Sequence, residues 1–205
     1  MSLNDLSLRE FSGALAGRSS VPGGGGASAA VAALGTALGS MVGNFTLGKK
    51  KHADAEPEIR RLLAEAETLR EALLTCVDAD AAAFEPLSRA YGIPRDDPSR
   101  GEIMEKCLRE AAAVPMRILE LSCRGIELHR QFAEKGSTMM LSDVGTGVVF
   151  CWAALYGAAL NVKVNTSLMA DRSYAEDLNK QVDEALDAYW RLADEVYENV
   201  YRRYC

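Results

Sequence analysis

The chain has 205 residues, of which 23 are Lys or Arg and 29 are Asp or Glu, so its formal net charge is −6. Hydrophobic residues make up 48% and charged residues 25%, a globular composition that excludes a wholly disordered chain. The acidic balance argues against a general nucleic-acid binder, because such a protein is basic over a whole face. This length suits one domain, which we expect to cover residues 1–205.

Cysteine and histidine usage argues against a metal site and against export. The five cysteines are widely spaced and form no CxxC pair, and the histidines are His52 and His129 alone. We therefore expect no bound metal. The N-terminus carries Asp5, Arg9 and Glu10 where a secretory signal would be apolar, so we expect a reduced, cytoplasmic protein.

Helix signals dominate the first half of the chain. Residues 3–17 form a short amphipathic stretch, and the glycine-rich residues 18–26 predict a loop. Residues 27–48 then contain no charged side chain. Residues 57–85 have helical periodicity, and Pro57 suits the first turn of a helix.

A second long helix is predicted after the loop around residues 91–98. Ser99 and Glu102 have the spacing of a capping box, which marks a helix N-terminus. Pro115 lies inside the helical pattern that follows and predicts a kink or break near Val114.

The last third of the chain again reads as helix. Asp143 precedes the uncharged residues 144–162 and is the predicted N-cap of that helix. A final helix is expected from residues 171–173 to about residue 203, with Ser173 and Glu176 as its capping box. Residues 162–164 show the one strand-like alternation. The predicted fold is all-α, a single-domain bundle of about six helices.

The two uncharged segments are long enough to span a bilayer. Segment 27–48 is mostly Ala, Gly, Ser and Thr, which is weakly hydrophobic, so we favour buried helices over membrane spans. Gly35, Gly39 and Gly43 share one helix face, which suits another backbone packed closely there, although membrane helix pairs use the same pattern. Two helices that are apolar all round exceed what four others cover, so we expect a homodimer.

A run of glycines, Pro22-Gly-Gly-Gly-Gly26, leads directly into a predicted helix. Glycine lets a backbone approach a ligand closely, and the free N–H groups of a helix N-terminus favour an anion or a carbonyl. A flexible connection is the alternative. At the far end of the same helix, Lys49, Lys50 and Lys51 either meet an anionic substrate or simply complement the helix dipole.

Acidic and amide side chains mark candidate functional positions. Asp80 falls on the apolar stripe of helix 57–85, whereas Asp78 points elsewhere and is expected to be solvated. A carboxylate on a buried face must be paired, hydrogen-bonded or protonated, and its pKa can shift toward neutrality, as a general acid or base requires. A structural role in holding a neighbouring helix is the alternative. Asn161 and Asn165 bracket the end of the second uncharged segment, where they cap a helix or bind a polar heterocycle.

The glycine run and the lysine cluster belong to a longer series of short sequence blocks. In chain order these blocks are Val21-Pro-Gly-Gly-Gly-Gly26, Met41-Val-Gly-Asn-Phe-Thr-Leu-Gly-Lys-Lys-Lys51, Asp78-Ala-Asp80-Ala-Ala-Ala-Phe84, Ala113-Val-Pro115, Ala133-Glu-Lys-Gly136, Leu141-Ser-Asp-Val-Gly145 and Ala159-Leu-Asn-Val-Lys-Val-Asn165. Over roughly residues 5–203 they resemble the formiminotransferase-cyclodeaminase/methenyltetrahydrofolate cyclohydrolase family. Tyr91-Gly-Ile-Pro94 and the single-domain length are most similar to its stand-alone bacterial cyclohydrolases. Phe45 and His52 depart from the family pattern of Leu and Tyr.

The resemblance implies an all-α, dimeric enzyme of folate one-carbon metabolism that needs no metal or redox cofactor. A cyclohydrolase opens 5,10-methenyltetrahydrofolate with water to 10-formyltetrahydrofolate, reversibly. A cyclodeaminase closes 5-formiminotetrahydrofolate to the methenyl compound and releases ammonia. The first activity is our prediction and the second the alternative; a catalytically silent folate-binding protein and a helical membrane or scaffold protein are the other candidates.

The candidate residues fit the chemistry that the resemblance implies, and we give them roles as hypotheses. Asp80 is the first candidate for proton transfer and Asp143 the second, with Lys49 able to return a proton to the leaving nitrogen. Lys50 and the amides of the glycine loop suit the glutamate carboxylates of the substrate. The candidates to hydrogen-bond the pterin edge are Asn44, Asn161 or Asn165. Pro22, Gly23, Gly24 and Gly25 complete the predicted substrate-binding set.

Overall fold

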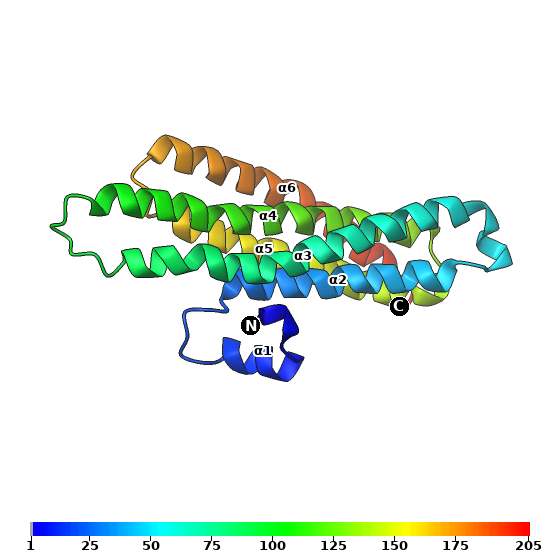
Figure 1. Ribbon diagram of the computed structural model, residues 1–205. Coiled ribbons are helices and arrows are strands. Elements are labelled where there is room, and N and C mark those ends of the chain that lie inside the picture. The colour runs from blue at the N-terminus through cyan, green and yellow to red at the C-terminus, as the bar shows by residue number, and fades with distance from the viewer. Residues whose placement is uncertain (1) are drawn as a thin grey trace.

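The computed structural model describes residues 2–205, and the regular elements in this part of the chain are all helices, joined by loops and turns (Figure 1). The expected all-α class is confirmed, and residues 162–164 are helical rather than extended. In chain order the elements are the 3₁₀ segment η1 (Leu3–Asp5), α1 (Leu8–Leu15), α2 (Gly24–Thr46), the 3₁₀ segment η2 (Lys50–Ala55), α3 (Glu56–Ala90), α4 (Arg100–Lys135), the 3₁₀ segment η3 (Thr138–Met140), α5 (Leu141–Thr166) and α6 (Arg172–Tyr201).

The five long helices lie in two layers. The layer of α2 and α5 runs antiparallel, and α3, α4 and α6 pack along one side of it. The short α1 lies beside α2, apart from the stack of long helices (Figure 1). One end of the bundle carries the loop at residues 91–99, and the other carries η2. The N-terminus of α2 and the C-terminus of α5 therefore meet at the loop end.

Glycines set the spacing at the α2–α5 contact. A Cβ added to Gly35 would lie 2.8 Å from the carbonyl oxygen of Gly147, so the two backbones touch here, as the glycine spacing predicts. At Gly39 and Gly43 the close neighbour is instead the ring of Phe132. The small residues on this face of α2 thus allow close contact with the backbone of α5 at one point and with the Phe132 side chain of α4 further along.

Several predicted helix ends differ from the structure. Helix α2 already begins at Gly24, where the Asp80 carboxylate accepts a hydrogen bond from the Gly26 N–H of the first turn. Asp143 lies within the first turn of α5 rather than at its N-cap, which is Met140. Asp171, not Ser173, caps α6 by accepting a hydrogen bond from the Tyr174 amide. The Ser99 side chain makes no capping bond to α4.

Apolar helices α2 and α5 are both long and apolar enough to cross a bilayer by length and composition. In the bundle, α2 packs against α3, α4 and α5, which is the environment of a core helix. Neither helix is covered all round, however. Each leaves an apolar stripe outward on the side of the layer away from α4, including Leu34, Phe45, Tyr156 and Leu160.

Thiol groups are unevenly exposed. Cys76, Cys107, Cys123 and Cys151 are buried, whereas Cys205 is exposed at the C-terminus. Burial raises the pKa of Cys123 and of Cys151 to about 12. Their thiols are therefore protonated at neutral pH.

His129 is fully buried where α4 meets α2 and α5. Its Nδ1 lies 2.7 Å from the Gly125 carbonyl oxygen, and a methyl group added at Gly147 would overlap its Nε2. Burial lowers the pKa of His129 from 6.5 to about 4, against the opposing effect of the Gly125 carbonyl. The ring is neutral in the folded protein at neutral pH.

Stability is therefore expected to fall in mild acid because of His129. The unfolded chain binds the proton near pH 6.5 and the folded chain only near pH 4, so protonation favours unfolding within that window. The expected loss below pH 4 is about 3 kcal/mol. Urea unfolding between pH 7 and pH 4.5 measures it, with His52→Gln as a control that keeps the full slope. If His129→Gln kept the same slope, His129 would not be its source.

Candidate active site

A cavity of about 210 Å³ lies at the loop end of the bundle, where the start of α2 meets α3, α4 and α5. It gathers many of the residues that the sequence marks as functional, although they are far apart in the chain. The lining residues are Ser20, Val21, Gly23 and Gly24 before and at the start of α2, Asp80 and Phe84 of α3, Ala111 and Pro115 of α4, and Asn161, Val164 and Asn165 of α5.

Asp80 is the acidic group of this cavity. Its Oδ2 accepts a hydrogen bond of 2.9 Å from the backbone N–H of Gly26, in the first turn of α2. Burial raises the pKa of Asp80 above its ordinary value, and the bond from Gly26 opposes that shift. The predicted buried carboxylate is thus present, and its proton affinity is suited to accepting and returning a proton.

The glycine run is built around this carboxylate. A Cβ added to Gly25 would lie 2.2 Å from Asp80 Oδ1, and one added to Gly24 would lie 3.1 Å from Asn161 Nδ2. Larger residues would therefore displace both side chains. The helix N-terminus that was expected to attract a ligand anion holds the carboxylate of the protein itself. Pro22 is buried directly before this turn.

Two asparagines of α5 hold their amides in fixed orientations. Asn161 Nδ2 donates to the carbonyl of Gly157, at 2.8 Å. Asn165 Nδ2 donates to the carbonyls of Asn161 and Ala111, at 2.8 and 3.2 Å. Carbonyls occupy both N–H groups of Asn165 and one of the two N–H groups of Asn161, so the two side-chain oxygens and the second N–H of Asn161 are left to bind a ligand.

Pro115 explains the contact between Asn165 and α4. Proline has no N–H, so the Ala111 carbonyl one turn earlier loses its helical partner. The amide of Asn165 replaces that donor, and α4 continues from Arg100 to Lys135 without the predicted break. The proline that the sequence marks as a helix breaker is thus part of the cavity wall.

Apolar side chains that no sequence motif marks as functional form the rest of the wall. Phe84 lies one turn after Asp80 on α3, and Val164 lies on α5. In sequence both look like ordinary core residues, although the i,i+4 spacing from a buried acid was a usable signal for Phe84. In the described part of the chain, none of the lining residues is Lys or Arg.

The remaining predicted residues lie at the opposite end of the bundle. Asn44 is near the end of α2, about 30 Å along that helix from Gly26 at ~1.5 Å per residue. Lys49 Nζ donates to Ser137 Oγ at 3.0 Å, and Lys50 is exposed at the start of η2. Asp143 is half-buried at the start of α5, again far from Asn161. One chain therefore carries two separate groups of predicted residues.

Asp78 is not solvated as expected. Its Oδ1 accepts a hydrogen bond of 2.6 Å from the backbone N–H of Leu3, and its Oδ2 accepts one of 3.1 Å from Asn4 Nδ2. The periodicity of α3 directs Asp78 away from the main core, but the N-terminal segment covers that side of the helix. Sequence spacing alone gives no sign of this contact.

Comparison with known proteins links the chain to enzymes that are named for reactions of folate compounds. Residues 7–184 match the family model described as formiminotransferase-cyclodeaminase. A methenyltetrahydrofolate cyclohydrolase of Methylorubrum extorquens is 36% identical over 197 residues, which cover 94% of this chain and 95% of that protein.

Two further relatives carry the name of the other activity. The formimidoyltransferase-cyclodeaminase of Mus musculus is 34% identical over 90% of this chain, which spans only 35% of that longer protein. The crystal structure of formiminotetrahydrofolate cyclodeaminase from Thermotoga maritima superposes with a TM-score of 0.83 at 32% identity, over 98% of this chain and 96% of the other. The fold is therefore shared with a solved structure along nearly its whole length.

Proposed function

Since the chain belongs to the formiminotransferase-cyclodeaminase family, we propose that it hydrolyses 5,10-methenyltetrahydrofolate to 10-formyltetrahydrofolate, reversibly. The full-length similarity to a methenyltetrahydrofolate cyclohydrolase supports this activity. The observation that carries the proposal is Asp80, a carboxylate held in a largely apolar cavity. The methenyl bridge is a cation, and a partly desolvated carboxylate attracts a cation more strongly than a solvated one does.

Asp80 has the position of a general base and acid for this reaction. A water molecule adds to the bridge carbon while the carboxylate accepts one of its protons, which gives a neutral tetrahedral carbon between N5 and N10. The bond from that carbon to N5 then breaks, N5 takes the proton from Asp80, and the hydroxyl oxygen becomes the formyl carbonyl as its own proton leaves to solvent. One proton is released overall, which balances the charge of the cation.

The other cavity residues bind and orient the substrate in this proposal. The side-chain oxygens of Asn161 and Asn165 accept hydrogen bonds from the N–H groups of the pterin edge. Phe84, Pro115 and Val164 pack against its rings and keep bulk water away from the carboxylate. No metal or redox cofactor takes part in the proposed steps, because water addition and proton transfer need only the carboxylate.

The alternative activity uses the same atoms. A cyclodeaminase joins N10 to the formimino carbon of 5-formiminotetrahydrofolate and expels ammonia, and Asp80 then supplies the proton that ammonia carries away. The solved Thermotoga maritima protein of similar length, which is named for that reaction, favours keeping this alternative.

One absorbance assay separates the two activities. The purified protein is mixed with 5,10-methenyltetrahydrofolate, and loss of the methenyl band faster than in the protein-free blank supports the hydrolase. Growth of the band from 5-formiminotetrahydrofolate, with ammonia released, supports the deaminase. No change with either compound contradicts both enzymatic proposals and leaves a silent folate binder, which equilibrium binding then tests.

We further propose that the chain acts as a homodimer, joined through the outward stripes of α2 and α5. On α2 one series of apolar residues that remain partly or fully exposed is Ala27, Val31, Leu34, Leu38, Met41 and Phe45. Their alternating spacing of four and three residues is the pattern of helices that pack against other helices. On α5 a parallel series with similar spacing runs from Val149 through Ala153, Tyr156 and Leu160 to Val164. In a two-fold symmetric dimer the same face of each copy packs against the other, so a second copy of this chain is the proposed partner.

An antiparallel pairing of these faces completes the substrate site. The cavity of one chain, at about 210 Å³, is smaller than the roughly 300–1,000 Å³ typical of pockets that enclose a drug-sized ligand, and its lining offers no cation for the glutamate carboxylates. A two-fold axis across the middle of the α2–α5 face brings the far end of the partner copy to this cavity. That end carries Lys49, Lys50, Asn44 and Asp143.

A heterodimer of two inactive variants is expected to recover activity. Chains with Asp80→Asn and chains with Lys49→Ala, each with its own tag, are co-expressed, and the mixed dimer is isolated on both tags. One of its two sites carries both substitutions and the other carries neither, so about half of wild-type activity is expected. If both residues act within one chain, every site is defective and the mixed dimer stays inactive. A fully active Lys49→Ala homodimer would remove Lys49 from the site.

The setting proposed for this enzyme is the cytoplasm, with a small-molecule substrate and neither nucleic acid nor membrane as partner. The net charge of −6 disfavours nucleic acid, and dimer formation covers the apolar stripes that would otherwise face a lipid or solvent.

A further inference from the structure

Residues 2–23 run along the outside of the bundle before they reach the cavity that contains Asp80. Residues 2–23, which we call the N-terminal strap, begin at η1 on the surface of α3, continue through α1 beside α2, and end at the glycine turn (Figure 1). Ser20, Val21 and Gly23, near its end, line the cavity that contains Asp80. The strap is thus one wall of the proposed active site.

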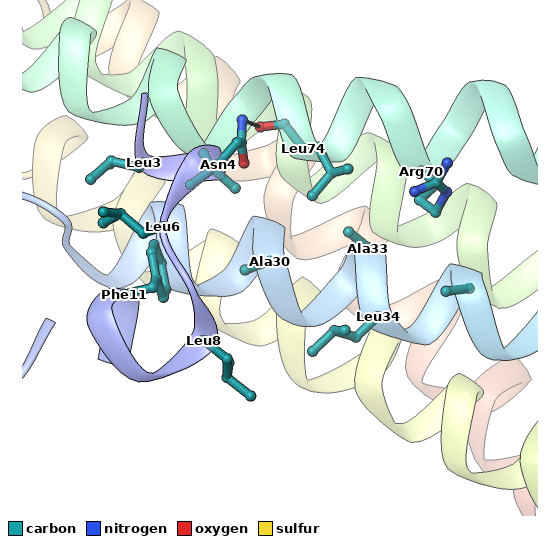
Figure 2. A pocket seen from close by; sticks show the side chains of 12 residues that line it. Leu3, Asn4, Leu6, Leu8, Phe11, Ala30, Ala33, Leu34, Arg70 and Leu74 are labelled. Atoms are coloured by element: carbon teal, nitrogen blue, oxygen red, sulfur yellow. Dashed lines mark hydrogen bonds between the residues drawn. The ribbon is translucent and has the colours of Figure 1, made fainter. Parts of the chain in front are cut away.

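A single carboxylate holds the beginning of the strap. Asp78 accepts hydrogen bonds from the Leu3 amide at 2.6 Å, from Asn4 Nδ2 at 3.1 Å, and from the Ser2 hydroxyl. Asn4 Nδ2 also donates to the carbonyl of Leu74 on α3, at 2.8 Å (Figure 2). These four bonds attach η1 to one turn of α3.

The middle of the strap is loosely packed by comparison. Helix α1 has no buried residue, and Leu8 is 78% exposed. Between the strap and α2 lies an apolar cavity of about 290 Å³, lined by Phe11, Ala30 and Leu34 among others (Figure 2). Arg70 reaches its rim but is already paired with Glu67 and Glu71. Apart from the packing of Phe11 against the main core, the strap is held in position at its two ends.

Its two ends are held by carboxylates only two residues apart. Asp78 holds the beginning of the strap, and Asp80 accepts a hydrogen bond from Gly26, just beyond its end. Both belong to the same turn of α3, so the strap is a loop whose ends are fixed to one short piece of helix. Asp78 itself does not line the active cavity.

We propose that Asp78 is a positioning residue, which holds the strap so that Ser20–Gly23 are in place to receive the substrate. This inference rests on the proposed function only for what the cavity binds. Without the Asp78 bonds, the beginning of the strap keeps only the bond from Asn4 to the Leu74 carbonyl and its apolar packing, so α1 and the loop after it are held more weakly and substrate binding must order them. Such an ordering cost weakens binding and leaves the chemical step at Asp80 unchanged, so KM rises while kcat is kept.

Kinetics with Asp78 variants test the proposal. Asp78→Ala removes every acceptor and is expected to raise KM about 10-fold with kcat within about twofold of wild type. Asp78→Asn keeps one acceptor oxygen and should give a smaller rise. Asp187→Asn, the same change at an exposed position of α6, is the control and should match wild type. A fall in kcat of about 100-fold in Asp78→Asn, with KM unchanged, would instead identify Asp78 as a catalytic group.

Proteolysis measures the strap without any substrate. Arg18 is an exposed trypsin site in the loop of the strap, and its cleavage is expected to become at least about fivefold faster in Asp78→Ala than in wild type and in Asp187→Asn. This result does not depend on the enzymatic assignment, so it separates a failure of the strap from a failure of the proposed function. Unchanged cleavage at Arg18 would overturn the proposal.

A double substitution shows whether Asp78 acts through the strap. Asn4→Ala removes two of the four bonds and leaves α3 untouched, so it should raise KM in the wild-type background even if Asp78→Ala folds poorly. In the Asp78→Ala background three of the four bonds are already lost, and Asn4→Ala removes only the remaining bond to the Leu74 carbonyl, so it should add less than about twofold. Independent, multiplying effects would contradict a shared role.

Discussion

Replacing Asp80 by asparagine is expected to lower kcat by about 10²–10⁴-fold, because the amide cannot take the proton from water or return it to nitrogen. Asparagine has nearly the same shape, and its side-chain oxygen can still accept the hydrogen bond from Gly26. Loss of rate is therefore the main expected effect, together with weaker binding of the cationic substrate, because the carboxylate that attracts the methenyl bridge is gone. Steady-state rates with the methenyl substrate, above the uncatalysed blank, give both quantities.

The same variant is expected to be at least as stable as wild type. Burial raises the pKa of Asp80, so the folded chain binds its proton more tightly than the unfolded chain does. The stabilising effect of the protonated acid is present at low pH and lost as pH rises, which leaves a costly buried charge at neutral pH. Asparagine removes that charge, so Tm should not fall. Activity within about threefold of wild type would remove Asp80 from proton transfer.

Gly25→Ala is expected to reduce kcat/KM by about 100-fold, a large effect for one methyl group. The new Cβ would lie 2.2 Å from Oδ1 of Asp80, inside any allowed contact, so the carboxylate must leave its position at the start of α2. Misplacing a reacting group by about 1 Å costs on the order of 10²-fold in rate. Activity and thermal unfolding measured together distinguish displacement from loss of the fold.

Gly101→Ala is the matched control for that substitution. Gly101 is the second residue of α4, as Gly25 is the second residue of α2, and nothing lies within 4 Å of a Cβ added there. Alanine favours helix over glycine by about 1 kcal/mol, so this control should be neutral or slightly stabilising. Equal activity of Gly25→Ala and Gly101→Ala would show that the position of the Asp80 carboxylate does not depend on a glycine at position 25.

Much of the site could be predicted because its residue types conflict with their surroundings. Asp80 interrupts an apolar stripe of α3, and a run of four glycines lies at the start of α2. Asp80 and part of the glycine run line the same cavity. Phe84 creates no such conflict, since an apolar residue on a core-facing stripe is what packing alone requires. Val164 is 57% exposed and belongs to the outward apolar series of α5, so its place in the cavity wall has no sequence signal of its own. Pro115 conflicts with its helical surroundings because it has no N–H, but the donor that replaces that N–H comes from Asn165, about 50 residues later in the chain.

Positions of the other predicted residues required the topology. Lys49 and Asp143 lie on neighbouring segments at one end of the bundle, whereas Asp80 and Asn161 lie at the other, because α2 and α5 run antiparallel along their whole lengths. Helical spacing fixes which face of a helix a residue occupies and says nothing about which ends of two helices meet. The contact of Asp78 with η1 is missing from the sequence pattern for the same reason.

The burial of four of the five cysteines has a practical consequence for chemical labelling. Thiolates react with alkylating reagents and thiols do not, and the raised pKa of Cys123 and Cys151 leaves almost no thiolate there at neutral pH. In the folded state the chain then behaves as a single-thiol protein with Cys205 as its reactive site. A fluorophore attached there needs no engineered cysteine, and its position four residues beyond the end of α6 keeps it clear of the core.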